Sequence, residues 1–457
     1  MSFPAYPANK ESGVEWMGEV PRHWNITPLK FSASCNDAVL PDSTDEDYEI
    51  KYVEISDVNE ISGITGSTSY KFSDAPSRAR RMLQDGDVLI STVRTYLRAI
   101  APVVTPPENL IASTGFAVIR PRKSILDGTF LGYLLRAEWW ISEVIARSVG
   151  VSYPAINASD LIGLNVPVPA WDEQIQIARF LDHETARIDA LIEEQQRLIE
   201  LLKEKRRALI SQAVTKGLDP TVLMKNSGVE WLGLVPSHWD VKQLKHVVDP
   251  NTSITYGIVQ AGPEFEGGVP YIRTSDMSGE ELPVSGYPLT SPEIDESYAR
   301  SRVRPGDIVM SIRASVGKCL LVPDELTVAN LTQGTAKISA GQGITRNFLL
   351  AFLNASATQN YFDLMAKGAT FKEITLDALR RTPVLLPPAN EQIKIDQFVA
   401  RNAGLLSETC KQAIQSVSLL QERRSALISA AVTGKIDVRG WQPPSGAPSP
   451  ELAKEAV

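Results

Sequence analysis

The stretch EQIQIARFLDHETARIDALIEEQQRLIELLKEKRRALISQAV at residues 173–214 decides the fold, because it reads as one long amphipathic helix. It contains neither glycine nor proline, and apolar residues recur every seven positions between mostly charged ones. At about 1.5 Å per residue, such a helix would reach roughly 60 Å, well beyond the helices of ordinary compact domains. Helices of this length usually act as spacers or as partner surfaces. The repeating residues are Leu181, Ile188, Leu202 and Leu209, with Ile177, Leu191 and Leu198 on an adjoining row.

A second copy of this stretch occupies residues 391–432 and aligns with the first without a gap. Glu173 and Gln174 fall on Glu391 and Gln392, and A-L-I-S at 208–211 falls on the same letters at 426–429. A gap-free match of this length indicates a duplication. The sequence therefore predicts two helices of matched length that bury their apolar rows against each other. The row of the second copy is Val399, Leu406, Ala413, Leu420 and Leu427.

A shorter repeat opens each half of the chain. SGVEWMGEVPRHWNITPLK at 12–30 recurs as SGVEWLGLVPSHWDVKQLK at 227–245, with twelve of nineteen positions identical. Its tryptophans suit either stacking on nucleic-acid bases or clamping the string onto its own domain. In a turn-rich string of glycine and proline, clamping is the more common role, so we interpret the string as the entry strap of a repeated module. These tryptophans are Trp16, Trp24, Trp231 and Trp239.

Between strap and long helix, each half has a strand-rich region followed by helical patterns. Y-V-E-I-S-D at 52–57 pairs with Y-I-R-T-S-D at 271–276, and G-D-V-L-I-S at 86–91 pairs with G-D-I-V-M-S at 306–311. Helical patterns follow at 129–145 and 344–362. Each half then runs through a Gly-x-x-aromatic-x-x-Ile string, GVSYPAI at 150–156 or GATFKEI at 368–374, into a proline-ended apolar segment before its long helix.

The predicted fold class is α+β, with two duplicated strand-rich modules separated by a pair of long antiparallel coiled-coil helices. The internal repeat implies pseudo-twofold symmetry. The straps and long helices of the two halves have similar sequences, so their surfaces are expected to do the same job. The module cores differ in sequence, so the surfaces of the two modules are expected to do different jobs. The predicted parts are a first module at 1–170, a first long helix at 171–217, a second module at 218–388, a second long helix at 389–437 and a flexible C-terminal tail at 438–457.

Composition narrows the classes of function. The 457 residues carry a net charge of −8, so any nucleic-acid binding must rest on local patches. No segment is long and apolar enough to span a membrane and no signal pattern opens the chain, so a cytoplasmic location is expected. Three cysteines and four histidines are too few and too scattered for a disulfide framework or a zinc site.

Motifs for catalysis are weak. Asp42, Glu49 and Lys51 resemble the P-D…E-x-K pattern of nucleases that hold Mg²⁺, yet such short fragments arise by chance in acidic loops. The chain has no phosphate-binding Walker loop, dinucleotide fingerprint or nucleophile elbow. We therefore expect no catalytic residues, no metal and no cofactor in this chain. A stand-alone magnesium-dependent nuclease stays open as an alternative, as does a coiled-coil scaffold that binds protein without DNA.

Basic residues gather beside the matched Gly-Asp strand in both halves. Residues 71–123 hold nine basic and four acidic side chains, and residues 300–318 hold five and one. Arginine suits phosphate contacts and bidentate reading of guanine. Because equivalent clusters occur in both halves, we predict DNA contact there rather than a solvated face. The predicted contacts are Lys71, Arg78, Arg80, Arg81, Arg94, Arg98, Arg120 and Lys123 in the first half and Arg300, Arg302, Arg304, Arg313 and Lys318 in the second.

Together these motifs resemble the specificity subunit of a type I restriction-modification enzyme. The resemblance covers nearly the whole chain and rests on S-G-V-E-W…V-P-x-H-W…L-K at both module starts, on V-P-V-P-A-W-D-E-Q-I-Q-I from 166, on L-L-P-P-A-N-E-Q-I-K-I at 385–395 and on the paired A-L-I-S helix ends.

The resemblance implies two target recognition domains that each read one half of a split, asymmetric DNA sequence, with the helix pair as a ruler. It also implies a subunit without catalytic activity, which docks two modification (methyltransferase) subunits and, through them, restriction (translocase and endonuclease) subunits. S-adenosylmethionine, ATP and Mg²⁺ would then belong to those partners. Double-stranded DNA would be the ligand, and no membrane would be involved.

Overall fold

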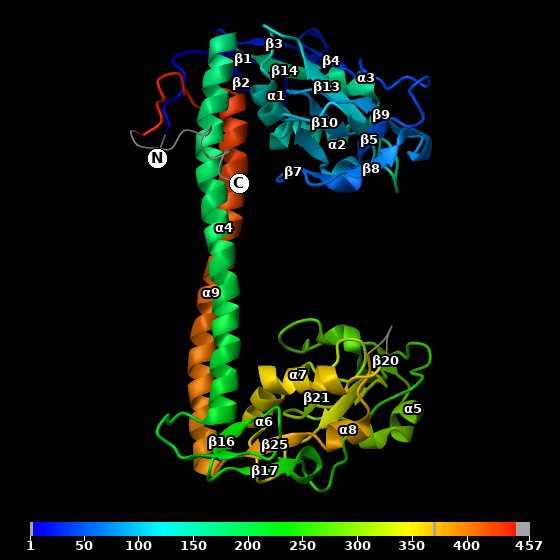
Figure 1. The fold of residues 1–457 in the computed structure, drawn as a ribbon, viewed down its shortest axis with the longest axis vertical. Coiled ribbons are helices and arrows are strands. Elements are labelled where there is room, and N and C mark those ends of the chain that lie inside the picture. Colours follow the sequence, from blue (N-terminus) through cyan, green and yellow to red (C-terminus); the bar gives the residue numbers. More distant parts are fainter. Residues whose placement is uncertain (1–2, 369–371, 445–457) are drawn as a thin grey trace. The chain divides into compact units, whose positions relative to one another are not determined.

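A computed structural model describes residues 3–368 and 372–444. The chain divides into two compact units, unit 1 from residues 1–195 and 415–457 and unit 2 from residues 196–414. The long helices are α4 (Trp171–Lys216) and α9 (Ala389–Val432), and each contributes one part to each unit (Figure 1). A unit therefore consists of one module, the start of the helix that follows it and the end of the other long helix.

Unit 1 is built on two four-stranded sheets in the orders β11-β10-β13-β4 and β8-β5-β12-β9. Pairing is antiparallel except between β5 and β12, which run parallel. The strands of these sheets are β4 (Ala33–Cys35), β5 (Glu49–Val53), β8 (Thr68–Lys71), β9 (Ala79–Met82), β10 (Val88–Ser91), β11 (Ile100–Pro102), β12 (Leu110–Ser113) and β13 (Phe116–Pro121). Three antiparallel pairs complete the unit: β1 (Asn9–Glu11) with β2 (Glu19–Pro21), β3 (Asn25–Pro28) with β14 (Asn165–Val168), and β6 (Val58–Asn59) with β7 (Gly63–Ile64).

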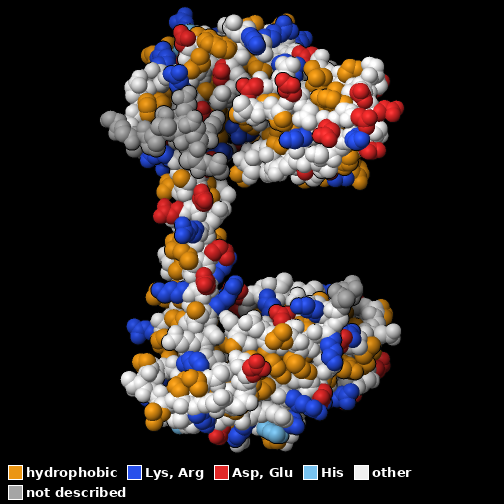
Figure 2. All heavy atoms as spheres, in the orientation of Figure 1, with side chains coloured by type: hydrophobic (Ala, Val, Ile, Leu, Met, Phe, Trp, Pro, Cys, Tyr) orange, Lys and Arg blue, Asp and Glu red, His pale blue; other side chains and the backbone are white. Residues whose placement is uncertain are grey.

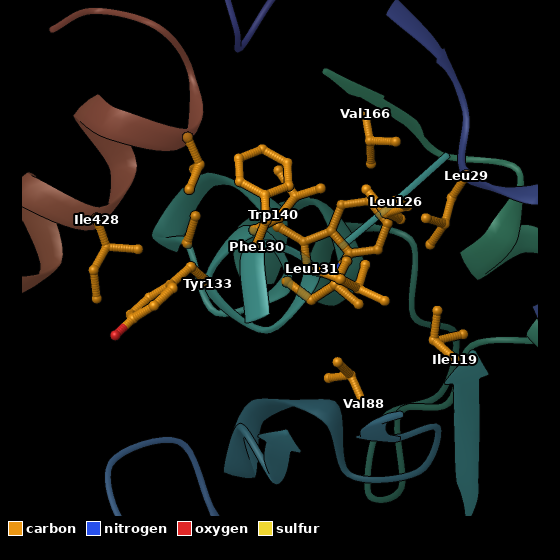
Figure 3. Close-up of a cluster of buried hydrophobic side chains, with 14 of the residues drawn as sticks. Leu29, Val88, Ile119, Leu126, Phe130, Leu131, Tyr133, Trp140, Val166 and Ile428 are labelled. Carbon is orange, nitrogen blue, oxygen red and sulfur yellow. The ribbon is translucent and has the colours of Figure 1, made fainter. Parts of the chain in front are cut away.

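Helices join the first of these sheets to α4. The helical pattern predicted at 129–145 forms two helices, α1 (Gly128–Leu135) and α2 (Glu138–Ala146), because the backbone turns extended at Ala137. A short α3 (Ala158–Ile162) follows. The core draws on Phe130, Leu131 and Trp140, and Ile428 of α9 belongs to the same cluster (Figure 3). Short 3-10 turns lie at Leu29–Phe31, Ile55–Asp57, Phe72–Asp74 and Thr95–Leu97.

Unit 2 repeats this plan with shorter strands. Its sheets have the orders β18-β24-β21-β22 and β20-β19-β23, and β19 with β23 is again the parallel pair. The sheet strands are β18 (Thr255–Tyr256), β19 (Val269–Ile272), β20 (Leu289–Thr290), β21 (Ile308–Ser311), β22 (Cys319–Leu321), β23 (Asn330–Leu331) and β24 (Thr335–Ile338). Two further pairs are β15 (Met224–Asn226) with β16 (Leu234–Pro236) and β17 (Asp240–Gln243) with β25 (Pro383–Leu386). The helices are α5 (Pro292–Ser297), α6 (Arg346–Leu353), α7 (Ser356–Met365) and α8 (Leu376–Arg380), and 3-10 turns lie at Leu244–His246, Thr274–Met277 and Ala299–Ser301.

The long helices pack against each other and against the module inside each unit. In unit 1, Leu181 of α4 and Ile428 of α9 share one core, and Arg424 of α9 pairs with Asp189 of α4 at 2.8 Å. In unit 2, Val214 of α4 and Ile395 of α9 share the other core. Because α9 ends where α4 begins, the two helices run antiparallel within each unit. Of the predicted seam residues, Leu181 and Ile188 are buried, and Leu202, Leu209, Val399, Leu406, Leu420 and Leu427 are half-buried.

Two of the three residues predicted for the adjoining row, Leu191 and Leu198, do not pack in the seam. Ile177 is buried, but Leu191 and Leu198 are 45% and 38% exposed. The residues that pack lie four positions after a residue of the seven-residue repeat, as Ile192 follows Ile188. Leu191 and Leu198 lie only three positions after such a residue and face solvent. Residues of the packed row are Thr185, Ile192, Ile199 and Ala213.

The strap is a clamp on the first turn of the long helix, as its composition predicts. In unit 1, the buried Trp24 donates its indole N–H to Glu173 at 3.1 Å, and Tyr6 donates its hydroxyl to the same carboxylate at 2.7 Å. In unit 2, Trp239 donates to Glu391 at 3.0 Å. The other two strap tryptophans also pack internally, since Trp16 stacks on Trp139 and Trp231 stacks on Tyr361.

The glutamine after each of these glutamates ties the helix to the loop that precedes the first module helix. Gln174 accepts from the backbone N–H of Asp127 and donates to the carbonyls of Ile125 and Pro169. Gln392 makes the equivalent three bonds, with Thr345, Gly343 and Pro387. The recurring E-Q pair is therefore a structural anchor, present twice.

Each strap also packs where the other long helix ends. Gly434 follows α9 with φ +72°, and a Cβ there would lie 2.2 Å from the ring of Pro21. Gly217 follows α4 with φ +77° and contacts Trp239. The left-handed backbone favours glycine at both positions, and at position 434 the close approach of Pro21 also excludes a side chain.

The segment after α9 meets the N-terminal part of the described chain in unit 1. The backbone N–H of Asp437 donates to the carbonyl of Pro4 at 2.7 Å, and Trp441 packs edge-on against Phe180 at 5.4 Å. Val438 is buried. The packed chain thus continues to Trp441, past the start of the predicted tail at 438, and residues 445–457 of that tail lie outside the described residues. In the part of the chain that the structure describes, no helix combines the length and apolar character needed to cross a bilayer.

Candidate nucleic-acid interface

Arg120 links three parts of unit 1 through hydrogen bonds to two aspartates. It makes two hydrogen bonds, at 2.7 and 2.8 Å, to Asp87, whose side chain is fully buried, and a third at 2.8 Å to Asp37. The hydrogen bonds to Asp87 raise the pKa of the Arg120 guanidinium, and the negative charges of Asp87 and Asp37 raise it further. Asp87 is the aspartate of the matched Gly-Asp strand. This geometry makes Arg120 a structural partner of that aspartate.

Two further predicted arginines are paired with carboxylates of their own unit. Arg98 forms a bidentate pair with Glu138 at 2.6 and 2.8 Å and approaches Glu60 at 3.6 Å. Arg302 bonds Asp295 at 2.6 Å and also pairs with Glu296. Both guanidiniums have a raised pKa because these carboxylates accept their hydrogen bonds. These carboxylates neutralise both guanidiniums and occupy part of their donors, which makes each a weaker candidate for a phosphate contact.

Most of the other predicted residues pair with exposed carboxylates, bond to the backbone or lie on the surface. Lys71 pairs with Asp47, Arg80 lies 3.4 Å from Asp42 and Arg313 pairs with Glu373 at 2.9 Å. Lys318 donates to the carbonyl of Ser278, and Arg81 lies half-buried on β9. Basic and acidic side chains are interspersed on the visible face of each unit (Figure 2). The exposed residues of the predicted set are Lys71, Arg78, Arg94, Lys123, Arg300 and Arg304.

Arg94 lies in the most distinctive of these settings. Its backbone has φ +50°, its N–H donates to the carbonyl of Pro154 at 2.7 Å and its guanidinium lies 4.6 Å above the ring of Tyr153. Val93 forms a β-bridge with Ala155, which joins the turn after β10 to the hairpin after α2. We call these two segments, residues 94–97 and 149–153, the tip of unit 1.

Unit 2 has the same backbone arrangement with other side chains. Ser311 matches Ser91, so Arg313 corresponds to Val93 and Ala314, with φ +61°, corresponds to Arg94. Arg313 bridges to Glu373 as Val93 bridges to Ala155. The equivalent hairpin includes residues 369–371, which lie outside the described residues. The two units therefore share a scaffold at this place and differ in its chemistry.

A hydroxyl-lined cleft of about 460 Å³ lies beside Ala314. Its chemistry suits a phosphate group, because hydroxyls donate hydrogen bonds and an ammonium supplies positive charge. The polar lining residues are Thr274, Ser275, Ser278, Ser311, Ser315 and Lys318.

The tip also carries exposed apolar side chains, which a search for basic clusters in the sequence does not detect. Val149, Val151 and Tyr153 are 81%, 102% and 64% exposed. The sequence signal was present, since GVSYPAI and GATFKEI recur at matching places, but their aromatic residue was not assigned a role. Exposure of these side chains follows from the tertiary hairpin, which periodicity does not specify.

Two of the three residues of the nuclease alternative, Glu49 and Lys51, lie on β5, an inner strand of its sheet, and Asp42 lies in the loop before it. Asp42 approaches Arg80, and Glu49 on β5 faces Lys71 of β8 in register. Within residues 3–368 and 372–444, no three His, Cys, Asp or Glu side chains are grouped closely enough to hold a metal ion.

The fold and its repeat place the chain in a class of proteins in which two modules are held by a duplicated strap and long helix. The model of the type I restriction modification DNA specificity domain matches this chain twice, at residues 31–202 and 236–415, and the chain belongs to that family. Each match contains one module and most of the long helix that follows it.

Individual relatives agree with this family. The EcoBI type I restriction enzyme specificity subunit of Escherichia coli is 26% identical over 308 residues, 66% of this chain and 65% of that subunit. The sequence designated the MjaX specificity subunit of Methanocaldococcus jannaschii is 26% identical over 435 residues, 93% of this chain and 96% of that one. A chain from a solved type I R-M system has a TM-score of 0.66 at 24% identity, covering 91% of this chain and 99% of its own length. The HsdS subunit of Thermoanaerobacter tengcongensis has a TM-score of 0.52 at 21% identity, with coverage of 91% and 98%.

Proposed function

We propose that this chain is the DNA-recognition subunit of a type I restriction-modification complex and reads a split, asymmetric target with its two modules. The observation that carries the proposal is the duplicated anchor: strap tryptophan, glutamate and glutamine make equivalent contacts in both units. One framework thus holds two modules whose surfaces differ. Identical frameworks suit one shared task, and different surfaces suit two different half-sites.

The half-sites would lie about one helical turn of DNA apart, about 10 bp between centres, if both modules address one face of the duplex. We assign the distance to α4 and α9, acting as an antiparallel coiled-coil ruler. Removing one heptad from each helix, residues 189–195 and 407–413, keeps the seam in register. At about 1.5 Å per residue in the helix and about 3.4 Å per base pair, it should shorten the spacer by about 3 bp.

Methylation profiling of the paired deletion tests the ruler. The bases of both half-sites should stay the same while the spacer shortens. Deleting residues 189–195 alone is the matched control, because it breaks the seam register and should abolish activity. Altered half-site bases in the paired deletion would contradict the ruler.

The remaining faces of the long helices would dock two modification subunits. Leu191, Leu198 and Leu201 form an exposed row on α4, and α9 exposes Leu405, Ile414 and Leu419. Apolar side chains at helical spacing suit a partner helix. The partners would carry S-adenosylmethionine, and restriction subunits bound through them would carry ATP and Mg²⁺, which leaves this chain without catalysis.

Native mass spectrometry tests the docking. The complex should contain two modification subunits for each copy of this chain. Leu198→Glu should weaken the binding of a modification subunit, whereas Gln196→Glu adds the same charge away from that row and should not. A fully active complex with a single modification subunit would contradict the proposed stoichiometry.

A further inference from the structure

We propose that the tip of unit 1, residues 94–97 and 149–153, is a wedge that stacks against DNA bases at the half-site read by this unit. The inference rests on the proposed function, because it assumes that unit 1 contacts one half of the target. In this contact, aromatic and aliphatic side chains of the tip lie against the faces of DNA bases, with Arg94 beside them.

The first argument is exposure. Val151 is fully exposed, and Val149 and Tyr153 are mostly exposed. The adjacent turn adds Tyr96 and Leu97, each about half exposed. Single exposed apolar residues are common, but five on two adjoining segments form a patch, and such patches mark binding sites. Burying these side chains against a ligand would remove apolar surface from water.

The second argument is the backbone that presents them. Arg94 and Arg98 both have positive φ, +50° and +53°, and they flank the 3-10 turn Thr95–Leu97. Non-glycine residues rarely adopt this conformation, because Cβ crowds the backbone. Here it is fixed by the bond from Arg94 to Pro154 and by a 2.8 Å hydroxyl contact between Thr95 and Ser148. Strained backbone held in this way is typical of functional sites.

The third argument is the arginine held beside an aromatic ring, which favours DNA over a protein partner. Segments 91–99 and 146–157 contain three arginines and no acidic residue. Arg98 and Arg147 are paired with glutamates of the same unit, while Arg94 lies over Tyr153. An arginine held on an aromatic ring places a cation beside a stacking surface, the combination that binds bases and backbone of opened strands. Apolar side chains that enter base steps unstack them.

The experiment uses the complex of the full chain with its modification subunits. Target duplexes carry the fluorescent base 2-aminopurine at successive positions of each half-site, because its fluorescence rises when it is unstacked. We expect a rise at one position of the half-site read by unit 1 in addition to the rise at the base that a modification subunit flips out. Tyr153→Ala should abolish the additional rise, leave the other half-site unchanged and weaken DNA binding about 5- to 150-fold, the loss of one stacked base.

Two variants complete the test. Tyr153→Phe keeps the ring and should bind within about 2-fold of the unaltered complex. Tyr48→Ala removes another exposed tyrosine, on the acidic loop between β4 and β5, and should change nothing. If Tyr153→Ala behaves like Tyr48→Ala, or the unaltered complex gives no fluorescence rise besides that of the flipped base, the wedge is wrong.

Loss of a modification subunit from the Tyr153→Ala complex, with unchanged DNA binding, would assign the tip to protein docking and overturn the inference. Failure of the proposed function would appear differently. In that case the unaltered complex would show no preference for a bipartite duplex, whatever residue stands at 153.

Discussion

Glu173 and Glu391 occupy equivalent places but differ in the number of buried donors that depend on them. Glu173 accepts from Trp24 and Tyr6, both buried, and contacts the half-exposed His23. Glu391 accepts from the buried Trp239 and contacts His238, which is 42% exposed at its side chain and can bond to water instead. Replacing each glutamate by alanine therefore leaves two buried donors unpaired in unit 1 and one in unit 2.

The expected losses follow from this count. An unpaired buried donor costs about 1–3 kcal/mol, so Glu173→Ala should lower the free energy of unfolding of unit 1 by about 2–6 kcal/mol. Glu391→Ala should cost unit 2 about half of that. Both variants delete the same atoms at matched sites, so cavity terms largely cancel in the comparison.

Native-state hydrogen exchange followed by mass spectrometry measures each unit separately, which matters because a chain of two units has no single defined unfolding transition. Peptides from the strap of unit 1 should lose more protection in Glu173→Ala than the matching peptides of unit 2 lose in Glu391→Ala. Equal or reversed losses would refute the reasoning from unpaired donors.

Three further outcomes are expected. Arg120→Ala leaves the buried carboxylate of Asp87 unpaired and should destabilise unit 1 by about 3–5 kcal/mol in hydrogen exchange, whereas Arg94→Ala should stay within about 0.5 kcal/mol of the unaltered chain. Gln174→Ala and Gln392→Ala each remove three hydrogen bonds and should cost their units similar amounts, about 3 kcal/mol; a marked difference in exchange protection would contradict the equivalence of the two anchors. Burial raises the pKa of the Cys35 thiol to about 11, so the folded state favours the thiol; the stability this gives is complete below about pH 9 and is lost as the pH rises toward 11. The urea midpoint of unit 1, followed by proteolysis of unit 1 peptides, should therefore fall less between pH 9 and pH 11 in Cys35→Ser than in the unaltered chain.

Elements with a local signature were predictable. The long helices follow from an unbroken amphipathic pattern, and the two strap tryptophans that bind glutamate follow from a repeated Gly/Pro string. The buried Gly-Asp strand was also recognised from its apolar run and from its repetition. In each case the pattern that predicts the element lies in residues close together in the sequence. The same pattern occurs again in the second half, which argues against a chance match.

Properties set by tertiary packing were not predictable in the same way. Arg120 looked like a DNA contact because Asp87 and Asp37, 33 and 83 residues away, are brought close only by folding. The partners of Arg302, Asp295 and Glu296, lie just before the basic cluster that was counted at 300–318. Leu191 and Leu198 fit a periodic row, but which side of a helix is packed depends on where its partner lies. Tyr153 lacked any charge signal, and its exposure depends on a hairpin joined to the turn after β10.

The central claim is that two modules on one framework read two separate half-sites. Methylome sequencing of a host that expresses this chain with its modification subunit tests it most directly. The account predicts one asymmetric motif interrupted by a fixed spacer of unread bases. A continuous motif, or a palindrome read identically by both modules, would contradict it.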